Sequence, residues 1–360
     1  MTQSTPTLPV ARPWGQTDDG TPVTLYTLRA GQLEVQITDY GGRLVSVRAP
    51  DRQGQLDEVS LGSNDLEPYL HHPEARYFGA LIGRYGNRIA DGRFELDGQS
   101  VQLELNNPPN ALHGGSGGFH ARVWNATPGL SAEGPTLRLQ RRSEDGEDGY
   151  PGALDVEVTY TVTADNALHI AYRASAEAPT VLNLTNHTYW NLSGAQLDSI
   201  LDHTLQLESD RYTPVSAVLI PTGELAEVDG TPMDFRTPHT LGERIDAPFD
   251  QLQHAGGYDH NFVLRGQDGT LQPAAVLHDP RSGRVMTVET TEPGMQVYSG
   301  NFQDGSLSGY HQRPYAYRTA VCLETQHYPD SPNQPQFPST RLDPGQAWTS
   351  HTVYRFSTQD

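Results

Sequence analysis

The chain has 360 residues and a formal net charge of −20, and all 24 of its basic side chains are arginines because the sequence contains no lysine. Enzymes that form a Schiff base on lysine, P-loop nucleotide hydrolases and protein kinases are therefore excluded. The acidic balance also argues against nucleic-acid or membrane-surface partners, since both need a basic face.

Residues 1–16 are polar, and we expect them to form a leader without regular secondary structure. The predicted elements follow it. From Thr21 onward, apolar and polar residues alternate in short segments, and this period is typical of strands. Asp97-Gly98 predicts a tight hairpin turn between two of them. Short helices are expected at 65–70 and 240–245. The predicted strands lie at 23–28, 33–37, 44–47, 94–96, 101–105, 137–139, 156–162, 168–172, 205–207, 262–264, 285–288, 295–298, 320–323 and 351–356.

The spacing of turn residues indicates the fold class. Turn signals recur every 8–12 residues or so, which is typical of a sandwich or barrel of antiparallel strands. Since no linker divides the chain, we predict an all-β fold with one large domain over 17–360. The single cysteine, Cys322, allows no internal disulfide, and neither a signal peptide nor a membrane span is visible. We therefore expect a cytoplasmic protein.

Two further segments resemble known site motifs. Gly114 to Gly118 matches the G-x-S-x-G pattern around Ser116. That motif needs a strand before the serine and a helix after it, whereas here both flanks are rich in turn residues. The acidic run 143–149 lacks the residue order of a calcium loop. We interpret both as loops, and the histidine spacings predict no metal site.

The densest polar segment is Asn183 to Leu192, whose sequence is NLTNHTYWNL. If it is extended, period 2 places His187 and Tyr189 on a face made entirely of hydrogen-bonding side chains. Such a face suits a hydroxyl-rich, sugar-sized ligand. The alternative is a solvent-exposed face that carries a passive histidine.

A second segment, Ala320 to Gln326, begins as an apolar strand and then presents Glu324. A carboxyl group there is costly unless it is used or paired. Partial burial raises the pKa of a carboxyl group and moves it toward general-base chemistry near neutrality. The alternative is a structural glutamate paired with an arginine.

Three irregular segments carry further candidate residues. Residues 83–88 and 106–118 are rich in glycine and asparagine and contain Arg88 and His113, and 256–261 contains Asp259 after two glycines. Polar loops on a rigid sheet often build binding sites. Each residue taken alone also fits an ordinary capping or turn position.

Taken in order, these segments resemble one family, the aldose 1-epimerases or galactose mutarotases. The similarity extends over nearly the whole chain. The matching stretches are GRYGNRIADGRF (83–94), NALHGG (110–115), NLTNHTYWNLSG (183–194), IPTGELAEVDGTPMDFR (220–236), GYDHNFVL (257–264), MQVYSGNF (295–302) and CLETQHYPDSPNQPQFPS (322–339).

The resemblance implies the galactose-mutarotase-like supersandwich and a reaction without cofactor or metal, in which the α and β anomers of free hexoses interconvert. It implies that Glu324 is the general base and His187 the general acid. His113 would support the acid and contact the sugar. The remaining implied binding residues are Asn87, Arg88, Tyr189, Asp259 and Gln296.

Two further expectations concern residues outside the site. Trp190, where the family often has Phe, is expected to pack inward, and the arginines other than Arg88 are expected at the surface in ion pairs. Two alternatives stay open within the fold: a hexose-6-phosphate 1-epimerase and a non-catalytic sugar-binding protein. The preferred hexose and the oligomeric state are also open.

Overall fold

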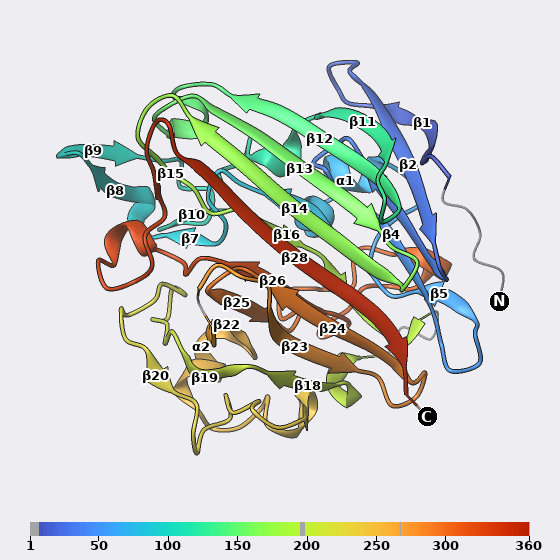
Figure 1. Ribbon diagram of the computed structural model, residues 1–360. Coiled ribbons are helices and arrows are strands. Elements are labelled where there is room, and N and C mark those ends of the chain that lie inside the picture. Colours follow the sequence, from blue (N-terminus) through green and yellow to red (C-terminus); the bar gives the residue numbers. More distant parts are fainter. Residues whose placement is uncertain (1–6, 195–198, 267, 360) are drawn as a thin grey trace.

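The computed structural model describes residues 7–194, 199–266 and 268–359 (Figure 1). Its largest sheet has nine strands, and the ladders between them are antiparallel. In spatial order they are β11 (Asn125–Leu130), β12 (Pro135–Ser143), β13 (Leu154–Val162), β14 (Ala167–Ala176), β28 (Ala347–Thr358), β24 (Arg284–Thr290), β23 (Gln272–His278), β18 (Thr204–Leu207) and β21 (His239–Thr240).

Two further large sheets complete the scaffold. The six-stranded sheet has the order β17 (Tyr189–Trp190), β26 (Val321–Gln326), β25 (Gly294–Tyr298), β22 (Asp259–Leu264), β19 (Ser209–Tyr212) and β20 (Ala226–Glu227). The five-stranded sheet runs β1 (Val10–Gln16), β2 (Pro22–Ala30), β3 (Leu33–Thr38), β4 (Leu44–Pro50) and β5 (Leu56–Glu58). The strand pairs are β7 (Arg88–Ile89) with β10 (Ala111–Leu112), β8 (Arg93–Leu96) with β9 (Gln99–Gln102), β6 (Ala80–Ile82) with β16 (Thr185–His187), and β15 (Thr180–Val181) with β27 (Arg341–Leu342).

The core lies between the nine-stranded and six-stranded sheets, and Figure 1 shows β26, β25 and β22 behind β28 and β24. The Tyr354 hydroxyl of β28 donates to the Leu323 carbonyl of β26 at 3.0 Å. Thr325 and Thr352 also meet across the two sheets, with their hydroxyl oxygens 2.6 Å apart. The predicted all-β antiparallel sandwich is thereby confirmed.

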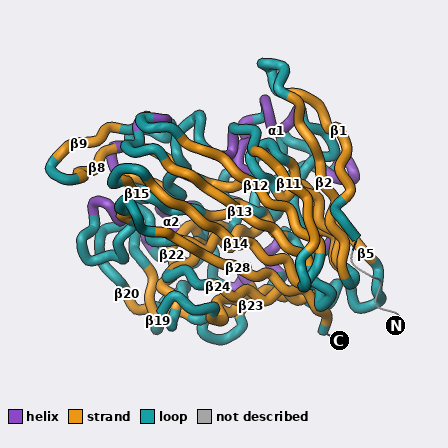
Figure 2. The backbone as a smooth tube through the Cα atoms, turned by 45° about the horizontal axis from the view of Figure 1, so that its top comes forward, coloured by secondary structure: helices purple, strands orange, loops and turns teal. Residues whose placement is uncertain are grey.

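Helices are few and short, as Figure 2 shows, and their positions correct part of the sequence interpretation. The α-helices of the described residues are α1 (Glu67–His71) and α2 (Asp250–Ala255). The helix expected at 65–70 is therefore present with shifted ends. The one expected at 240–245 shrinks to a 3₁₀ turn at Leu241–Glu243. No helix in the described part of the chain has the length and apolarity that crossing a membrane requires.

The expected leader over 1–16 is wrong in its second half, because residues 10–16 form β1 and pair with β2. This strand lies at the edge of its sheet, and its residues are exposed or only half-buried. An edge strand without a buried face carries no alternating pattern, so period 2 did not reveal it.

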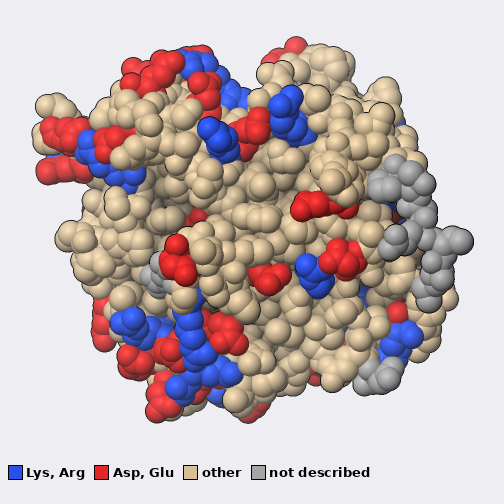
Figure 3. Space-filling model, viewed as in Figure 1, with Lys and Arg blue, Asp and Glu red and all other residues tan. Residues whose placement is uncertain are grey.

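Several arginines are also not at the surface, contrary to expectation. Arg43 is fully buried and donates to the carbonyls of four residues: Ala75, Arg76, Phe78 and His120. Arg84 and Arg284 are buried too and likewise bind backbone carbonyls. Figure 3 shows the exposed charges gathered mainly toward the edges of this face, with both signs mixed at the lower left. Some arginines of this fold are therefore buried, and each of them donates several hydrogen bonds to backbone carbonyls.

Trp190 packs inward as expected, with no exposed surface, against Tyr354 and Phe356 at ring distances of 5.1 and 5.8 Å. We expect Trp190→Ala to lower the free energy of unfolding by about 3–5 kcal/mol because it leaves a large cavity. Trp190→Phe should cost less than about 1.5 kcal/mol, since the indole N–H has no hydrogen-bond partner among the described residues. Urea unfolding of both variants measures the difference. Equal losses of unfolding free energy in the two variants would contradict this account.

Candidate active site

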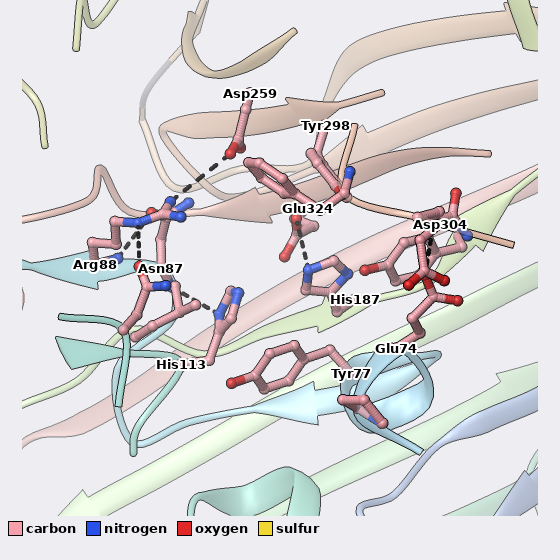
Figure 4. A pocket seen from close by; sticks show the side chains of 16 residues that line it. Glu74, Tyr77, Asn87, Arg88, His113, His187, Asp259, Tyr298, Asp304 and Glu324 are labelled. Carbon is pink, nitrogen blue, oxygen red and sulfur yellow. Dashed lines mark hydrogen bonds and ion pairs between the residues drawn. The ribbon is translucent and has the colours of Figure 1, made fainter. Parts of the chain in front are cut away.

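A cavity of about 470 Å³ opens on the face of the six-stranded sheet that points away from the core (Figure 4). Because Thr325 faces β28 inside the sandwich, period 2 turns its neighbour Glu324 to this opposite face. The strand register then sets Asp259, Tyr298, Cys322 and Tyr189 in one row across four strands. The cavity is lined by Pro73, Glu74, Tyr77, Asn87, Arg88, Asn107, Leu112, His113, His187, Tyr189, Asp259, Tyr298, Phe302, Gln303, Asp304 and Glu324.

The two central groups of the cavity are His187 and Glu324. His187 ends β16 and Glu324 lies within β26, and the His187 Nε2 atom is 3.6 Å from the Glu324 Oε1 atom. Both side chains are buried, with exposed side-chain fractions of 6% and 2%. Glu324 has no arginine ion pair among the described residues, so the structural alternative considered for it loses its support.

The imidazole of His187 is fixed from three sides. It stacks between Tyr77 and Tyr189, with ring centroids 5.9 and 4.9 Å away and planes inclined by only 14° and 15°. Its Nδ1 atom lies 3.5 Å from the Cys322 sulfur. Burial raises the pKa of the Cys322 thiol, so the thiol keeps its proton and its neutral sulfur can accept the Nδ1–H of the imidazole. In that arrangement Nε2 carries no proton and can accept one from the side of the cavity.

His113 is held in one tautomer by the backbone. The Asn87 N–H donates to the His113 Nδ1 atom at 3.1 Å, and the His113 N–H donates to the Asn87 carbonyl at 3.0 Å. Nδ1 is therefore an acceptor, and a neutral ring must carry its proton on Nε2. Burial, followed by the neighbouring His187, lowers the pKa of His113 and keeps it neutral. His113 consequently serves as a hydrogen-bond donor in the site.

A second polar cluster lies on the other side of Glu324. The Arg88 Nη1 atom is 3.8 Å from an Asp259 carboxylate oxygen, and Arg88 Nε donates to the Asn107 side-chain oxygen at 3.2 Å. Gln296 Nε2 donates to the Asp259 Oδ1 atom at 2.6 Å. The guanidinium and the carboxylate together offer donors and acceptors suited to neighbouring sugar hydroxyls.

Burial controls the protonation of the central pair. It raises the pKa of Glu324 well above its ordinary value, with the Asp259 charge adding to the effect. Burial also lowers the pKa of His187 to about 3. The upward shift expected for the pKa of Glu324 is confirmed in direction. The general-acid role expected for His187 requires a protonated imidazole, whereas burial favours the neutral one. With the cavity empty, a neutral imidazole faces a protonated carboxyl group.

The structure brings the residues predicted from the sequence together around one cavity. Asn87, Arg88, His113, His187, Tyr189, Asp259 and Glu324 line it. Gln296 does not line it but holds Asp259 from the neighbouring strand. Their assignment as acid, base and binding groups stays a prediction.

The segment 183–192 differs in detail from the extended polar face that was expected. It breaks into β16, which pairs with β6, and β17, which pairs with β26, and every residue in it is buried. Asn183 and Asn191 bind backbone carbonyls rather than facing a ligand. Of the proposed ligand face, His187 and Tyr189 reach the cavity.

Sequence reasoning did not single out several lining residues, among them Tyr77, Asn107, Tyr298, Glu74, Gln303 and Asp304. Tyr298 could have been found, because it alternates with Gln296 along β25 and therefore shares its face. Residues 73–77 and 302–304 carry no periodic pattern. Their part in the site follows from the fold alone.

The two motif-like loops contribute nothing to this cavity. Ser116 donates to the Glu104 carboxylate. The strand before it, β10, has only 2 residues and ends at Leu112, and the element after it is the 3₁₀ turn Phe119–Ala121 rather than an α-helix. The esterase interpretation therefore has no structural support in the described residues. The acidic run 143–149 connects β12 and β13, as the hairpin interpretation predicted.

Within the described residues, one group of side chains could ligate a metal ion: His187, Cys322 and Glu324, whose donor atoms lie within 4.8 Å of one another. A cysteine ligates zinc as the thiolate, and a carboxyl group ligates it when deprotonated. Burial raises the pKa of both groups and so disfavours these forms. The donor chemistry therefore fits a metal poorly, and the expectation of a metal-free reaction stays a prediction.

Comparison with known proteins identifies the class to which this fold and cavity belong. The family model described as aldose 1-epimerase matches residues 24–355. The chain is 44% identical to the galactose mutarotases of Bos taurus and Homo sapiens, covering 93% and 94% of this chain and 94% and 95% of theirs. It is 38% identical to the aldose 1-epimerase of Escherichia coli (strain K12), over 94% of this chain and 96% of that protein.

Solved structures give the same result. The galactose 1-epimerase from Lactobacillus acidophilus aligns with a TM-score of 0.86 and 26% identity, covering 99% of this chain and 100% of that one. The aldose epimerase homologue from C. elegans aligns with a TM-score of 0.82 and 29% identity, covering 92% of this chain and 97% of that one. The chain belongs to the aldose 1-epimerase family.

Proposed function

We propose that this chain interconverts the α and β anomers of free aldohexoses such as galactose and glucose, without a cofactor, by opening and reclosing the sugar ring. Glu324 acts as the general base and His187 as the general acid. The observation that carries the proposal is the buried 3.6 Å contact between these two groups in a cavity of an aldose 1-epimerase fold. The named relatives support the reaction class.

The reaction needs one proton shared between the two groups. In the active form Glu324 is ionised and takes the proton of the anomeric hydroxyl, while protonated His187 gives one to the ring oxygen. The C1–O5 bond breaks, and the open-chain aldehyde lies beside a protonated Glu324 and a neutral His187. Rotation about C1–C2 presents the other carbonyl face. Both transfers then reverse, the ring closes as the other anomer, and the enzyme is restored.

The neutral pair that burial favours in the empty cavity contains the same number of protons as this active form. The two forms differ only in which partner holds the proton. When hydroxyl groups of a bound sugar solvate the new charges, the proton crosses from Glu324 to His187 over their short contact. The empty site thus already has the protonation of the open-chain intermediate.

This sharing predicts the pH dependence of kcat/KM, which reports the groups of the sugar-free enzyme. The pair gains a second proton only near the lowered pKa of His187, about 3, and loses its last one only at the raised pKa of Glu324. Because one proton is retained between these limits, kcat/KM should stay constant as pH rises through about 6.5, the ordinary histidine value. It should fall only on the alkaline side. Polarimetry from about pH 5 upward, corrected for the buffer rate, tests this; a halving of kcat/KM near pH 6.5 would indicate an independent histidine.

The direct test of function is polarimetry of freshly dissolved α-galactose and α-glucose. Purified protein should speed the approach to the equilibrium rotation in proportion to its concentration. A rate equal to that of buffer alone would refute the proposal. Saturable galactose binding without any acceleration would instead favour a non-catalytic sugar-binding protein.

A cytoplasmic location belongs to the same proposal. It is supported by a single cysteine, which is buried and forms no disulfide, since disulfides are rare in the cytosol. Fractionation of the source cells tests it.

A further inference from the structure

One end of the cavity carries polar groups to which the proposed reaction gives no role. Gln303 is 6% exposed, and neither its amide nitrogen nor its amide oxygen has a hydrogen-bond partner among the described residues. The Oε2 atom of Glu74 is buried in the same unpartnered state. The Oε2 atom of Glu324, the proposed base at the centre of the cavity, is also buried without a hydrogen-bond partner among the described residues. Buried polar atoms without partners are costly, so their presence along a cavity wall indicates a ligand that supplies the missing partners.

The two groups are held side by side by the backbone. Glu74 lies on the 3₁₀ turn η1 (Pro73–Tyr77), and its Oε1 atom accepts the N–H of Asp304, which directly follows Gln303. Figure 4 shows Glu74 and Asp304 together on the side of His187 that faces away from Arg88. Glu74, Gln303 and Asp304 are therefore called the acidic end of the cavity.

The polar groups of the cavity thus follow a definite order: Arg88 and Asp259 first, then Glu324, then His187, and finally the acidic end. The edge of a pyranose presents its own order, which is the C2 hydroxyl, the anomeric hydroxyl on C1, the ring oxygen, and the C6 carbon on C5. If Glu324 acts on the anomeric hydroxyl and His187 on the ring oxygen, the two orders coincide. The C2 hydroxyl then points toward Asp259 and the C6 group toward the acidic end.

We propose that Glu74 and Gln303 bind the 6-hydroxyl of the sugar and give the enzyme a preference for an uncharged hydroxymethyl group at C5. This inference rests on the proposed function, because that function sets the direction of the sugar. The Gln303 amide can both donate to and accept from a hydroxyl, and the free Glu74 oxygen can accept its proton.

The charge of the acidic end sharpens this specificity. Hydrogen bonds from Ser306 lower the pKa of Asp304 and keep it ionised, and it lies against Glu74. Arg88, the arginine among the lining residues, lies at the opposite end. A 6-phosphate or a 6-carboxylate would therefore meet like charge at this end of the cavity. This arrangement disfavours the hexose-6-phosphate alternative.

The experiment compares D-galactose with 6-deoxy-D-galactose and D-galacturonate by polarimetry. The unaltered protein should show a kcat/KM about tenfold lower for the 6-deoxy sugar, since one hydrogen-bonded hydroxyl is lost. Gln303→Leu should lower the galactose value to that of the 6-deoxy sugar and leave the latter unchanged. Glu74→Gln keeps the oxygen that accepts the Asp304 N–H and should raise the galacturonate value relative to galactose. Gln253→Leu, an exposed position on α2, serves as the control.

The possible outcomes separate this inference from the proposed function. Equal rates for galactose and the 6-deoxy sugar in the unaltered protein would overturn the assignment of the 6-hydroxyl, while the epimerase activity would stand. This comparison needs no variant and so does not depend on whether Gln303→Leu folds. Failure to accelerate any sugar would overturn the proposed function and this inference with it.

Discussion

Glu324→Gln is expected to lower kcat for galactose about 10²–10⁴-fold while the protein stays folded. The amide has nearly the same shape as the carboxyl group, so the packing on β26 is preserved. It accepts no proton from the anomeric hydroxyl, and the proton shared with His187 disappears from the site. Because the carboxyl group is buried and makes no ion pair with any arginine in the described part of the chain, a neutral replacement leaves no unpaired cation behind.

The control for this variant is Glu227→Gln, an exposed glutamate on β20, which should keep full activity. Circular dichroism and urea unfolding establish that both proteins are folded. A Glu324→Gln enzyme with a near-native rate would remove Glu324 from the role of general base.

His187→Asn is the second large effect, with an expected loss in kcat of about 10²–10⁴-fold. Asparagine retains a hydrogen-bonding side chain but has no group that titrates, so the ring oxygen receives no proton as the ring opens. The space between Tyr77 and Tyr189 is left partly empty, and some loss of stability should accompany the loss of rate.

Polarimetry and urea unfolding separate the two consequences for His187→Asn. His254→Asn, on the exposed face of α2, should leave both rate and stability unchanged. Retention of a tenth or more of the native rate in His187→Asn would mean that another group, such as His113, supplies the proton.

The sandwich was predictable because its central strands have one face in the core and one outside. Strand β13 alternates buried and more exposed residues, and this period is visible in the amino-acid sequence alone. The Asp97-Gly98 turn likewise forms the predicted hairpin between β8 and β9. The sequence did not predict strand β1 or helix α2. Strand β1 buries no face, and helix α2, with six residues, is too short to show a helical period.

The site was predictable residue by residue, but not as an arrangement. Motifs singled out His187 and Glu324, yet their contact depends on β17 pairing with β26, which lies more than 100 residues further along the chain. No local pattern reports such a pairing. Gln303 and Glu74 lie in segments without period, so their burial against the same cavity became visible only in three dimensions.

The buried guanidinium of Arg43 has a consequence for how sugars bind. By donating to the carbonyls of Ala75, Arg76 and Phe78 and also to that of His120, it anchors the turn that carries Glu74 and Tyr77 to another part of the chain. The cavity wall is thereby rigid before any sugar arrives. Little conformational entropy is then lost on binding, so the contacts made to the sugar are expressed more fully as affinity and selectivity. The ammonium group of a lysine has three donors and could not satisfy four carbonyls at once. This buried position therefore favours arginine over lysine.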